Sequence, residues 1–351
     1  MTDSKPLTED EIKLYDRQIR LWGVKAQGDV RNSHILVINL TSVGVEVCKN
    51  LVLGGIGSLT IVDGSKVIDQ DLNVNFFLDE TQVGQFKLEA CKSRIRDLNP
   101  RVELDTETRD WTSIVNLEEF ITRFSLVVAT GVCESEIVRL NGLTRRLGIP
   151  FYCSGTHGLY GYIFADLIAH QSNVKYDSQS SKKVGPIDPV SSITSVKEIK
   201  ENDTQTQCCT IRNEFRPFDQ LSGKFLKQKY PSTKKQIKKI CTLLPAILAL
   251  LKLPSYLNKL TEDVDVSANE LQKQTLKVLS QLKLPQEIAL KNPETITNLA
   301  RQAYCEYQPV SSILGGALSQ DIINYIVKNE LPINNITVLD GYSDEMPVYT
   351  L

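Results

Sequence analysis

The first half of the chain alternates between two patterns of apolar residues. Short, nearly continuous apolar runs are typical of buried strands, and they occur in HILVINL, SLTIVD, RVELDTET, FSLVVAT and IPFYCSG. Between them lie segments in which apolar positions recur every three to four residues, as in GVEVCKNLVLGG, QVGQFKLEACKSRIRDLNP and ESEIVRLNGLTRRLG. Because strands and helices interleave, the pattern predicts an α/β fold with a doubly wound, mostly parallel, Rossmann-like sheet.

The middle of the chain has a different texture. Residues 171–203 are rich in Ser, Lys, Asp and Asn without an apolar period, which predicts a loop or a partly disordered segment. Residues from about 215 to 304 are typical of helices punctuated by prolines, and the α/β pattern then returns. We therefore expect one α/β domain formed by residues 1–170 and 305–351, interrupted by a helical insertion, residues 171–304, with a partly disordered start.

Composition narrows the class of protein. Of 351 residues, 41% are apolar and 23% charged, as in soluble globular proteins, and the net charge of −2 predicts no general affinity for nucleic acid or membranes. The N-terminus has no apolar core of a signal peptide, and the longest apolar run, residues 240–253, is too short to span a bilayer. A nuclear or cytosolic location is expected. The lysines of KFLKQKYPSTKKQIKKI favour a solvated helix face over a nuclear-import signal.

Cysteine and histidine usage argues against metal and disulfide chemistry. The eight cysteines are scattered without any C-x-x-C pair, and there are three histidines. We expect no disulfide framework and no metal site. Each cysteine is expected to be a packed or idle thiol, with the adjacent pair Cys208 and Cys209 the hardest to dismiss as reactive. His157 is assigned no catalytic task.

The first strand–turn–helix unit is where a glycine-rich phosphate loop is expected. Asn39, Thr41 and Ser42 stand where glycines would allow positive φ and close approach of the backbone to a phosphate. Gly44 still permits the helix to pack against the strand. Asp63, at the end of the second strand, is either the acid that meets ribose hydroxyls or an ordinary turn residue. We interpret the loop as a degenerate phosphate site.

Five segments together resemble the activating enzymes of ubiquitin-like proteins. They are LYDRQIRLWG, the loop above, LTIVDGSKVIDQDLNVNFFL, VGQFKLEACKSRIRDLNPRVEL and PVSSILGGALSQDIINYIVKNELPINNITVLDG. In that family two related adenylation domains of the ThiF and MoeB type form a pair, and one of them binds ATP. The chain resembles the smaller, non-ATP-binding subunit of the SUMO-activating type, and the insertion is expected to correspond to half of a catalytic-cysteine domain.

The resemblance also assigns positions in the degenerate site. Asn73 and Lys87 match an asparagine of the active half's N-x-x-R segment and its lysine, whereas Val74 is taken to replace the arginine. Cys133 falls near the position of the magnesium-binding aspartate, and Glu134 or Glu136 could substitute if the turn moved. The residues Asn39, Thr41, Ser42, Gly44, Asp63, Asn73 and Lys87 are therefore expected to be vestigial, with no cofactor bound by this chain.

Arg17, in YDRQIR, is the candidate catalytic residue. A guanidinium offers forked donors that match phosphate oxygens, and the resemblance implies that Arg17 reaches the ATP of the partner subunit as an arginine finger. The alternative is a salt bridge to Asp16 or Glu11. Arg20 is the second, less favoured candidate for this role, and the alternative for it is to anchor the segment beside Trp22.

The remaining implications of the resemblance concern partners. The expected partner is a catalytic SUMO-activating subunit, which holds ATP and Mg²⁺, adenylates the SUMO C-terminus and then accepts it on its own cysteine as a thioester. A nuclear location, with some protein in the cytoplasm, is expected. Three alternatives remain: the equivalent subunit for another ubiquitin-like modifier, a scaffold without chemistry, and a Rossmann oxidoreductase that binds NAD through an atypical loop.

Overall fold

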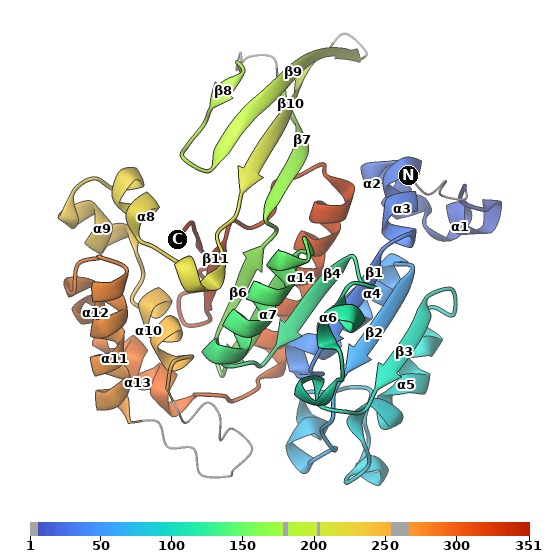
Figure 1. Cartoon of the computed structure of the whole chain (residues 1–351), viewed down its shortest axis with the longest axis horizontal. Coiled ribbons are helices and arrows are strands. Elements are labelled where there is room, and N and C mark those ends of the chain that lie inside the picture. The colour runs from blue at the N-terminus through green and yellow to red at the C-terminus, as the bar shows by residue number, and fades with distance from the viewer. Residues whose placement is uncertain (1–5, 178–181, 202–203, 254–266) are drawn as a thin grey trace.

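A central eight-stranded sheet organises the computed structural model, which describes residues 6–177, 182–201, 204–253 and 267–351 (Figure 1). The strand order is β12-β11-β6-β5-β4-β1-β2-β3. The five strands from β5 to β3 pair in parallel, and β6, β11 and β12 add an antiparallel side. The predicted doubly wound, mostly parallel sheet is confirmed. The strands are β1 (His34–Ile38), β2 (Ser58–Val62), β3 (Glu103–Glu107), β4 (Leu126–Thr130), β5 (Phe151–His157), β6 (Tyr160–Asp166), β11 (Ile336–Asp340) and β12 (Val348–Tyr349).

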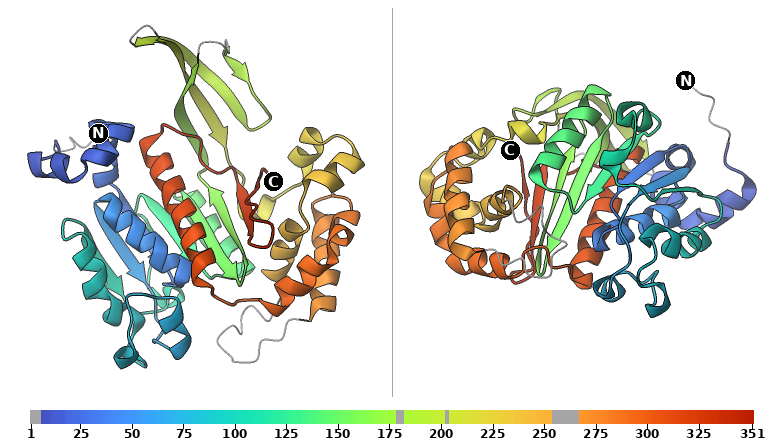
Figure 2. Two further views of the ribbon diagram at one scale, coloured as in Figure 1. Left: turned by 180° about the vertical axis from the view of Figure 1, so that it is seen from behind. Right: turned by 60° about the horizontal axis from the view of Figure 1, so that its bottom comes forward.

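Helices cover both faces of this sheet because successive residues of its central strands, which point to opposite faces, are apolar. In β1, Ile35 and Val37 join the core beneath α4 (Ser42–Gly54), α5 (Lys87–Leu98) and α14 (Gln308–Val327). Leu36 and Ile38 join the opposite core, beneath α6 (Leu117–Ile121) and α7 (Glu134–Arg146). Figure 2 shows α4 and α14 side by side on one face. A strand buried on both sides reads as a continuous apolar run, which is why these strands were predictable.

The predicted loop over residues 171–203 is wrong for the described part of that segment. It forms three strands of a second, antiparallel sheet, ordered β7-β10-β9-β8, which projects from the main body in Figure 1. The bounds are β7 (Ala169–Asp177), β8 (Gly185–Pro186), β9 (Ser191–Glu201) and β10 (Thr204–Glu214). Its buried core consists of Ile193, Cys209 and Ile211. Backbone pairing rather than apolar burial holds this sheet, so the apolar pattern of the sequence is weak there. The disorder expected at 178–181 and 202–203 lies outside the described residues.

The rest of the insertion is helical, as predicted. Its helices are α8 (Lys224–Lys229), α9 (Thr233–Lys239), α10 (Leu243–Leu250), α11 (Ala268–Gln281), α12 (Glu287–Lys291) and α13 (Pro293–Arg301). The apolar run at 240–253 forms α10, and this helix shares the core of the main sheet. Among the described helices, none is both long and apolar enough to cross a membrane. The lysines of α8 and α9 are all exposed, so they lie on solvated helix faces.

Three short helices at the start of the chain form what we call the N-terminal arm: α1 (Glu9–Leu14), α2 (Asp16–Trp22) and α3 (Val24–Arg31). Thr8 and Glu11 form a reciprocal capping box that starts α1. Two side chains fix the arm to the main domain. Tyr15 is 5% exposed and its hydroxyl accepts a hydrogen bond from Asn99, while Gln27 donates to the Gly54 carbonyl at the end of α4.

Candidate functional site

The degenerate phosphate loop lies at the carboxyl ends of β1, β2 and β4, which is where open α/β sheets bind their ligands. The loop residues Asn39 to Thr41 connect β1 to α4, and Thr41 is the N-cap residue of that helix. Asp63 follows β2, and Thr130 is the last residue of β4. The structure therefore brings these sequence-predicted site residues together.

The loop is closed by its own side chains. Asn39 has the left-handed conformation that a glycine would adopt, with φ of 64°, and its side chain donates to the Thr130 carbonyl at 3.1 Å. The Thr130 hydroxyl donates to the Asn39 carbonyl at 2.6 Å and accepts from the Thr41 hydroxyl at 2.8 Å. A Cβ on Gly44 would lie 2.7 Å from the Asn39 carbonyl oxygen. Gly44 is therefore needed for close packing of helix and loop, as expected.

Asp63 serves the turn in which it lies. Its two carboxylate oxygens accept the backbone N–H groups of Leu40 at 2.6 Å and Ser65 at 2.7 Å. The residue is buried. These contacts give Asp63 the role of an ordinary turn residue. The ribose-binding alternative stays a prediction, since each carboxylate oxygen keeps a second lone pair.

Lys87 lies in a buried group of charges behind the loop. Its ammonium is 2.9 Å from the Asp71 carboxylate, and both side chains are about nine-tenths buried. Burial acts to lower the pKa of Lys87, but the carboxylates of Asp63 and Asp71 raise it more, with a smaller contribution from Glu306. The net pKa lies above the ordinary lysine value, so Lys87 stays charged inside the fold.

Glu306 was not anticipated from the sequence. Its carboxylate accepts the backbone N–H of Ser42, the first residue of α4, at 3.0 Å. Ser311 donates to the Ser42 hydroxyl at 2.7 Å. Burial raises the pKa of Glu306, while the Ser42 N–H and the Lys87 ammonium act in the opposite direction. The two partners are 264 residues apart, so no local pattern could have revealed the contact.

The segment matched to N-x-x-R lies on a short 3-10 helix and the turn after it. Asn73 is the last residue of this helix, and Val74, taken to replace the arginine, follows it. Val74 is buried and Phe76 is 47% exposed, with the Lys49 ammonium 5.2 Å from its ring centroid. Asn73 is exposed, whereas its neighbour Asn75 is buried and accepts the Phe77 N–H at 3.0 Å. The guanidinium is thus absent from this position, and Asn75 stabilises the turn.

The candidate metal position after β4 is occupied by structural contacts. Cys133 is buried, and its N–H donates to the Glu136 carboxylate at 2.7 Å, which caps the start of α7. Glu134 pairs with Lys252 at 2.8 Å. Neither glutamate is available as a substitute for the missing aspartate. Across the described ranges, no group of three His, Cys, Asp or Glu side chains could hold a metal ion.

Arg17 is exposed on α2, and over the described residues the structure gives it no hydrogen bond or ion pair. The expected alternative, a salt bridge to Asp16 or Glu11, is wrong because other arginines take both carboxylates. Arg20 pairs with Asp16 at 2.9 Å, and Arg31 pairs with Glu11 at 3.1 Å.

The anchoring role expected for Arg20 is also wrong. The Trp22 indole donates to Gln27 at 3.1 Å, and Arg20 stays exposed in its pair with Asp16. The N-terminal arm is attached at the carboxyl end of α4, through Gln27 to Gly54 and through Tyr15 beside Gly55. Because α4 has 13 residues, this attachment lies about 20 Å along the helix from the degenerate loop at its other end.

The described cysteines are free thiols, and five of them are buried: Cys48, Cys91, Cys133, Cys153 and Cys209. Burial raises the pKa of Cys91 to about 11 and also raises that of the exposed Cys305. Thiols with raised pKa values are poor nucleophiles at neutral pH. In the second sheet Cys209 is buried and its neighbour Cys208 is half-buried, so the two thiols do not form an exposed reactive pair.

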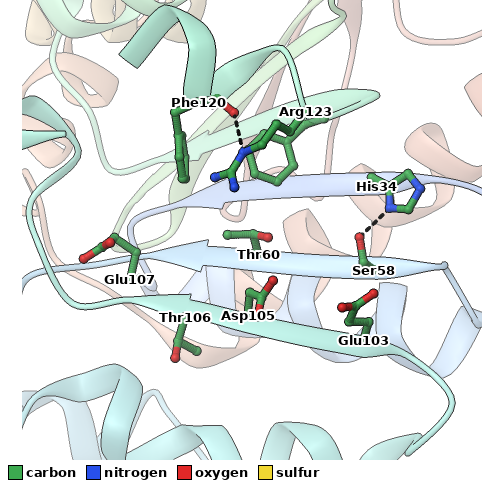
Figure 3. A pocket seen from close by; sticks show the side chains of 10 residues that line it. His34, Ser58, Thr60, Glu103, Asp105, Thr106, Glu107, Phe120 and Arg123 are labelled. Atoms are coloured by element: carbon green, nitrogen blue, oxygen red, sulfur yellow. Dashed lines mark hydrogen bonds between the residues drawn. The ribbon is translucent and has the colours of Figure 1, made fainter. Parts of the chain in front are cut away.

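A separate hollow of about 310 Å³ lies over the face of β1, β2 and β3 beside α6 (Figure 3). It is lined by polar and acidic side chains, among them Glu103, Asp105 and Glu107, with Arg123 stacked 4.4 Å from the Phe120 ring centroid. His34, Ser58 and Glu103 begin their strands, so the hollow extends toward the amino ends of the sheet. It is therefore distinct from the ligand position expected for this architecture.

Together these features define an α/β domain of the nucleotide-binding type whose phosphate loop is filled by its own side chains. The chain belongs to the ThiF family, which it matches over residues 15–351.

Curated relatives extend this similarity over nearly the whole chain. The chain is 39% identical to DNA damage tolerance protein RHC31 of Saccharomyces cerevisiae, over 98% of this chain and 97% of that protein. It is 33% identical to DNA damage tolerance protein rad31 of Schizosaccharomyces pombe, over 98% of each. It is 27% identical to SUMO-activating enzyme subunit 1 of Homo sapiens, over 95% of this chain and 93% of that protein. The resemblance to activating enzymes of ubiquitin-like proteins is thereby confirmed.

Proposed function

We propose that this chain is the smaller, non-ATP-binding subunit of a heterodimeric SUMO-activating enzyme and that it supplies Arg17 to the ATP site of its partner. The relatives named SUMO-activating enzyme subunit 1 support the assignment to SUMO activation. In the proposed complex the partner holds ATP and Mg²⁺, which activate the C-terminal carboxylate of SUMO as an acyl-adenylate with loss of pyrophosphate. The thiolate of a partner cysteine then attacks the acyl-adenylate, which forms the thioester and releases AMP.

The filled loop supports the absence of a nucleotide on this chain. A nucleotide site needs backbone donors, a metal and cations arranged around the phosphates. Here Thr130 and Thr41 close the loop, Glu306 takes the first N–H of α4, and the position after β4 carries Cys133. The same features count against an NAD-dependent oxidoreductase, because dinucleotides use the same phosphate position.

The placement of Arg17 is the observation that carries the proposal. Nearby carboxylates are already paired with Arg20 and Arg31, so the guanidinium of Arg17 remains available to an external anion. The N-terminal arm is anchored at the end of α4 away from the degenerate loop. A phosphate contacted by Arg17 therefore belongs to another chain, where its forked donors would neutralise charge that develops at the α-phosphate during adenylation.

A nuclear location, with some protein in the cytoplasm, is part of the proposal. The net charge of −2 supports a protein partner rather than nucleic acid or membrane lipid.

The test is ATP–pyrophosphate exchange by the complex of this chain with its catalytic partner. Arg17→Ala should slow SUMO-dependent exchange at least about 100-fold, the scale of a missing arginine finger, while the subunits still co-elute on gel filtration. Lys25→Ala is the matched control, since it removes an exposed cation of α3 in the same N-terminal arm and, among the residues that the structure describes, frees no carboxylate that Arg17 could pair with, so it should change the rate less than about threefold. If the Arg17→Ala complex exchanges pyrophosphate at the normal rate, Arg17 is not an arginine finger, and the chain acts as a scaffold without chemistry of its own.

A further inference from the structure

Glu306 places a negative charge at the start of α4. Its carboxylate oxygen is 3.0 Å from the Ser42 nitrogen, at the first residue of a 13-residue helix. The first-turn N–H groups of a helix have no partner within the helix, and the helix dipole favours an anion there. In nucleotide-binding folds the anion at this position is a phosphate. Here it is a side chain of the same polypeptide.

Two groups near Glu306 favour its charged form. The Ser42 N–H and the Lys87 ammonium both act to lower the pKa of this carboxyl, although burial is the larger effect and raises the pKa overall. Ser42 is also fixed from the other side, because Ser311 of α14 donates to its hydroxyl at 2.7 Å. Ser42 is 1% exposed, whereas Thr41 and Glu306 are half-buried, so Glu306 lies between the first residue of α4 and solvent.

The backbone that leads to Glu306 is fixed by the turn between β5 and β6. The Gly158 N–H donates to the Cys305 carbonyl at 2.7 Å, and the Leu159 N–H donates to the Gln302 side chain at 2.8 Å. A Cβ on Gly158 would lie 2.2 Å from that same Gln302 oxygen, which shows how tightly the two segments are packed. These contacts hold residues 302–305, at the end of the insertion, in a fixed position, and so they fix where the Glu306 carboxylate meets α4.

We propose that the Glu306 carboxylate is a built-in anion that occupies the phosphate position at the start of α4 and keeps phosphate out of it. The affinity for a phosphate group is latent in this fold and is blocked by one of its own residues. The inference rests on one part of the proposed function, that this chain holds no nucleotide of its own. It is independent of Arg17 and of the modifier that is activated.

The experiment titrates inorganic phosphate into the full-length chain by calorimetry, without metal. Glu306→Ala should bind phosphate with a dissociation constant at least about tenfold lower than the wild-type chain, because the N–H of Ser42 loses its internal partner. Glu306→Gln keeps the side-chain volume and an acceptor for the Ser42 N–H, so its affinity for phosphate should stay close to that of the wild-type chain. Glu119→Ala removes one exposed charge from α6 and controls for the change in net charge.

Each outcome bears on the inference. Equal phosphate affinity in Glu306→Ala and wild type overturns it, as does a gain of the same size in Glu119→Ala. Glu306→Ser serves as a second opened variant if the alanine variant unfolds, and failure of the serine variant to gain phosphate affinity also overturns the inference. ATP binding by the wild-type chain would instead contradict the proposed function, so the two failures are distinguishable.

Discussion

Tyr15 lies directly against Gly55, so closely that a Cβ on Gly55 would lie 2.5 Å from the Tyr15 ring carbon that bears the hydroxyl. Gly55 ends α4 in the left-handed conformation, with φ of 77°. The same hydroxyl of Tyr15 accepts a hydrogen bond from Asn99 at 2.9 Å. Since Arg17 follows two residues after Tyr15, this contact determines where the N-terminal arm presents its free guanidinium.

Gly55→Ala should therefore destabilise the chain by about 2–4 kcal/mol, through left-handed strain together with the clash against Tyr15. The matched control is Gly148→Ala. Gly148 has a similar φ of 72°, but a Cβ there meets nothing within 4 Å, so strain alone should cost about 1 kcal/mol. Urea unfolding measures both. Equal costs for the two variants would show that the Tyr15 contact is unimportant.

Two adjacent glycines of α14 should respond in opposite directions. A Cβ on Gly315 would lie 2.3 Å from the Cβ of Glu46 on α4, whereas a Cβ on Gly316 meets nothing within 4 Å. Gly315→Ala should cost about 2 kcal/mol or more because the two helices must separate. Gly316→Ala should stabilise the isolated chain by about 0.5–1 kcal/mol through helix propensity. Thermal unfolding of the two variants compares them, and destabilisation by both would contradict the packing described.

Lys87 should act as a structural residue. Lys87→Met leaves the buried Asp71 carboxylate without its cation and should cost about 3–5 kcal/mol. Arg94→Ala removes a cation from the half-exposed pair with Asp79 and should cost less than about 1 kcal/mol. Adding Asp71→Asn to Lys87→Met should recover part of the loss. Denaturant unfolding of the isolated chain provides the measurement, and a Lys87→Met variant as stable as wild type would refute the buried pair.

Asp321 should make stability depend on pH. Its carboxylate is buried on α14, where it accepts hydrogen bonds from the Tyr152 hydroxyl at 2.7 Å and the Ile333 N–H at 2.9 Å. Burial raises its pKa from 3.8 to about 6. The folded state therefore holds the proton more tightly than the unfolded state, and the stability from this proton is complete below pH 3.8 and lost as pH rises through about 6.

Asp321→Asn cannot titrate, so its stability relative to wild type should improve by up to about 3 kcal/mol between pH 4 and pH 7. Urea midpoints collected across this range test the expectation. Parallel pH profiles for the two proteins would mean that the pKa of Asp321 is close to its ordinary value.

Much of the main domain could be predicted because its strands are buried on both faces. The continuous run around Val37 and the helix that ends at Gly55 carry their structure in local patterns. The second sheet could not be predicted in this way. Most residues of its strands are polar, and its buried core, which includes Ile211, is small. The structure there depends on hydrogen-bonded pairing between strands that are distant in the sequence, such as β7 and β10.

In the candidate site, too, local features could be predicted from the sequence and contacts between distant residues could not. The degenerate loop was recognisable from Asn39 and Thr41, since the absence of glycine is a local fact of the sequence. Glu306, which contacts the start of α4 beside this loop, comes from the other end of the insertion in the sequence. Within the described ranges, Arg17 has no ion pair because Arg20 and Arg31 pair with the nearby carboxylates of Asp16 and Glu11. Such choices among equivalent charges are made by tertiary geometry.

The acidic hollow over β3 has a consequence for handling the protein. β3 is the edge strand of the main sheet, and an exposed edge can pair with another molecule. Glu103 and Asp105 put negative charge on this edge, and Glu107 is held in an ion pair with Arg109. Repulsion between these charges opposes edge-to-edge association near neutral pH. Salt screens that repulsion, so high ionic strength should promote association through this strand.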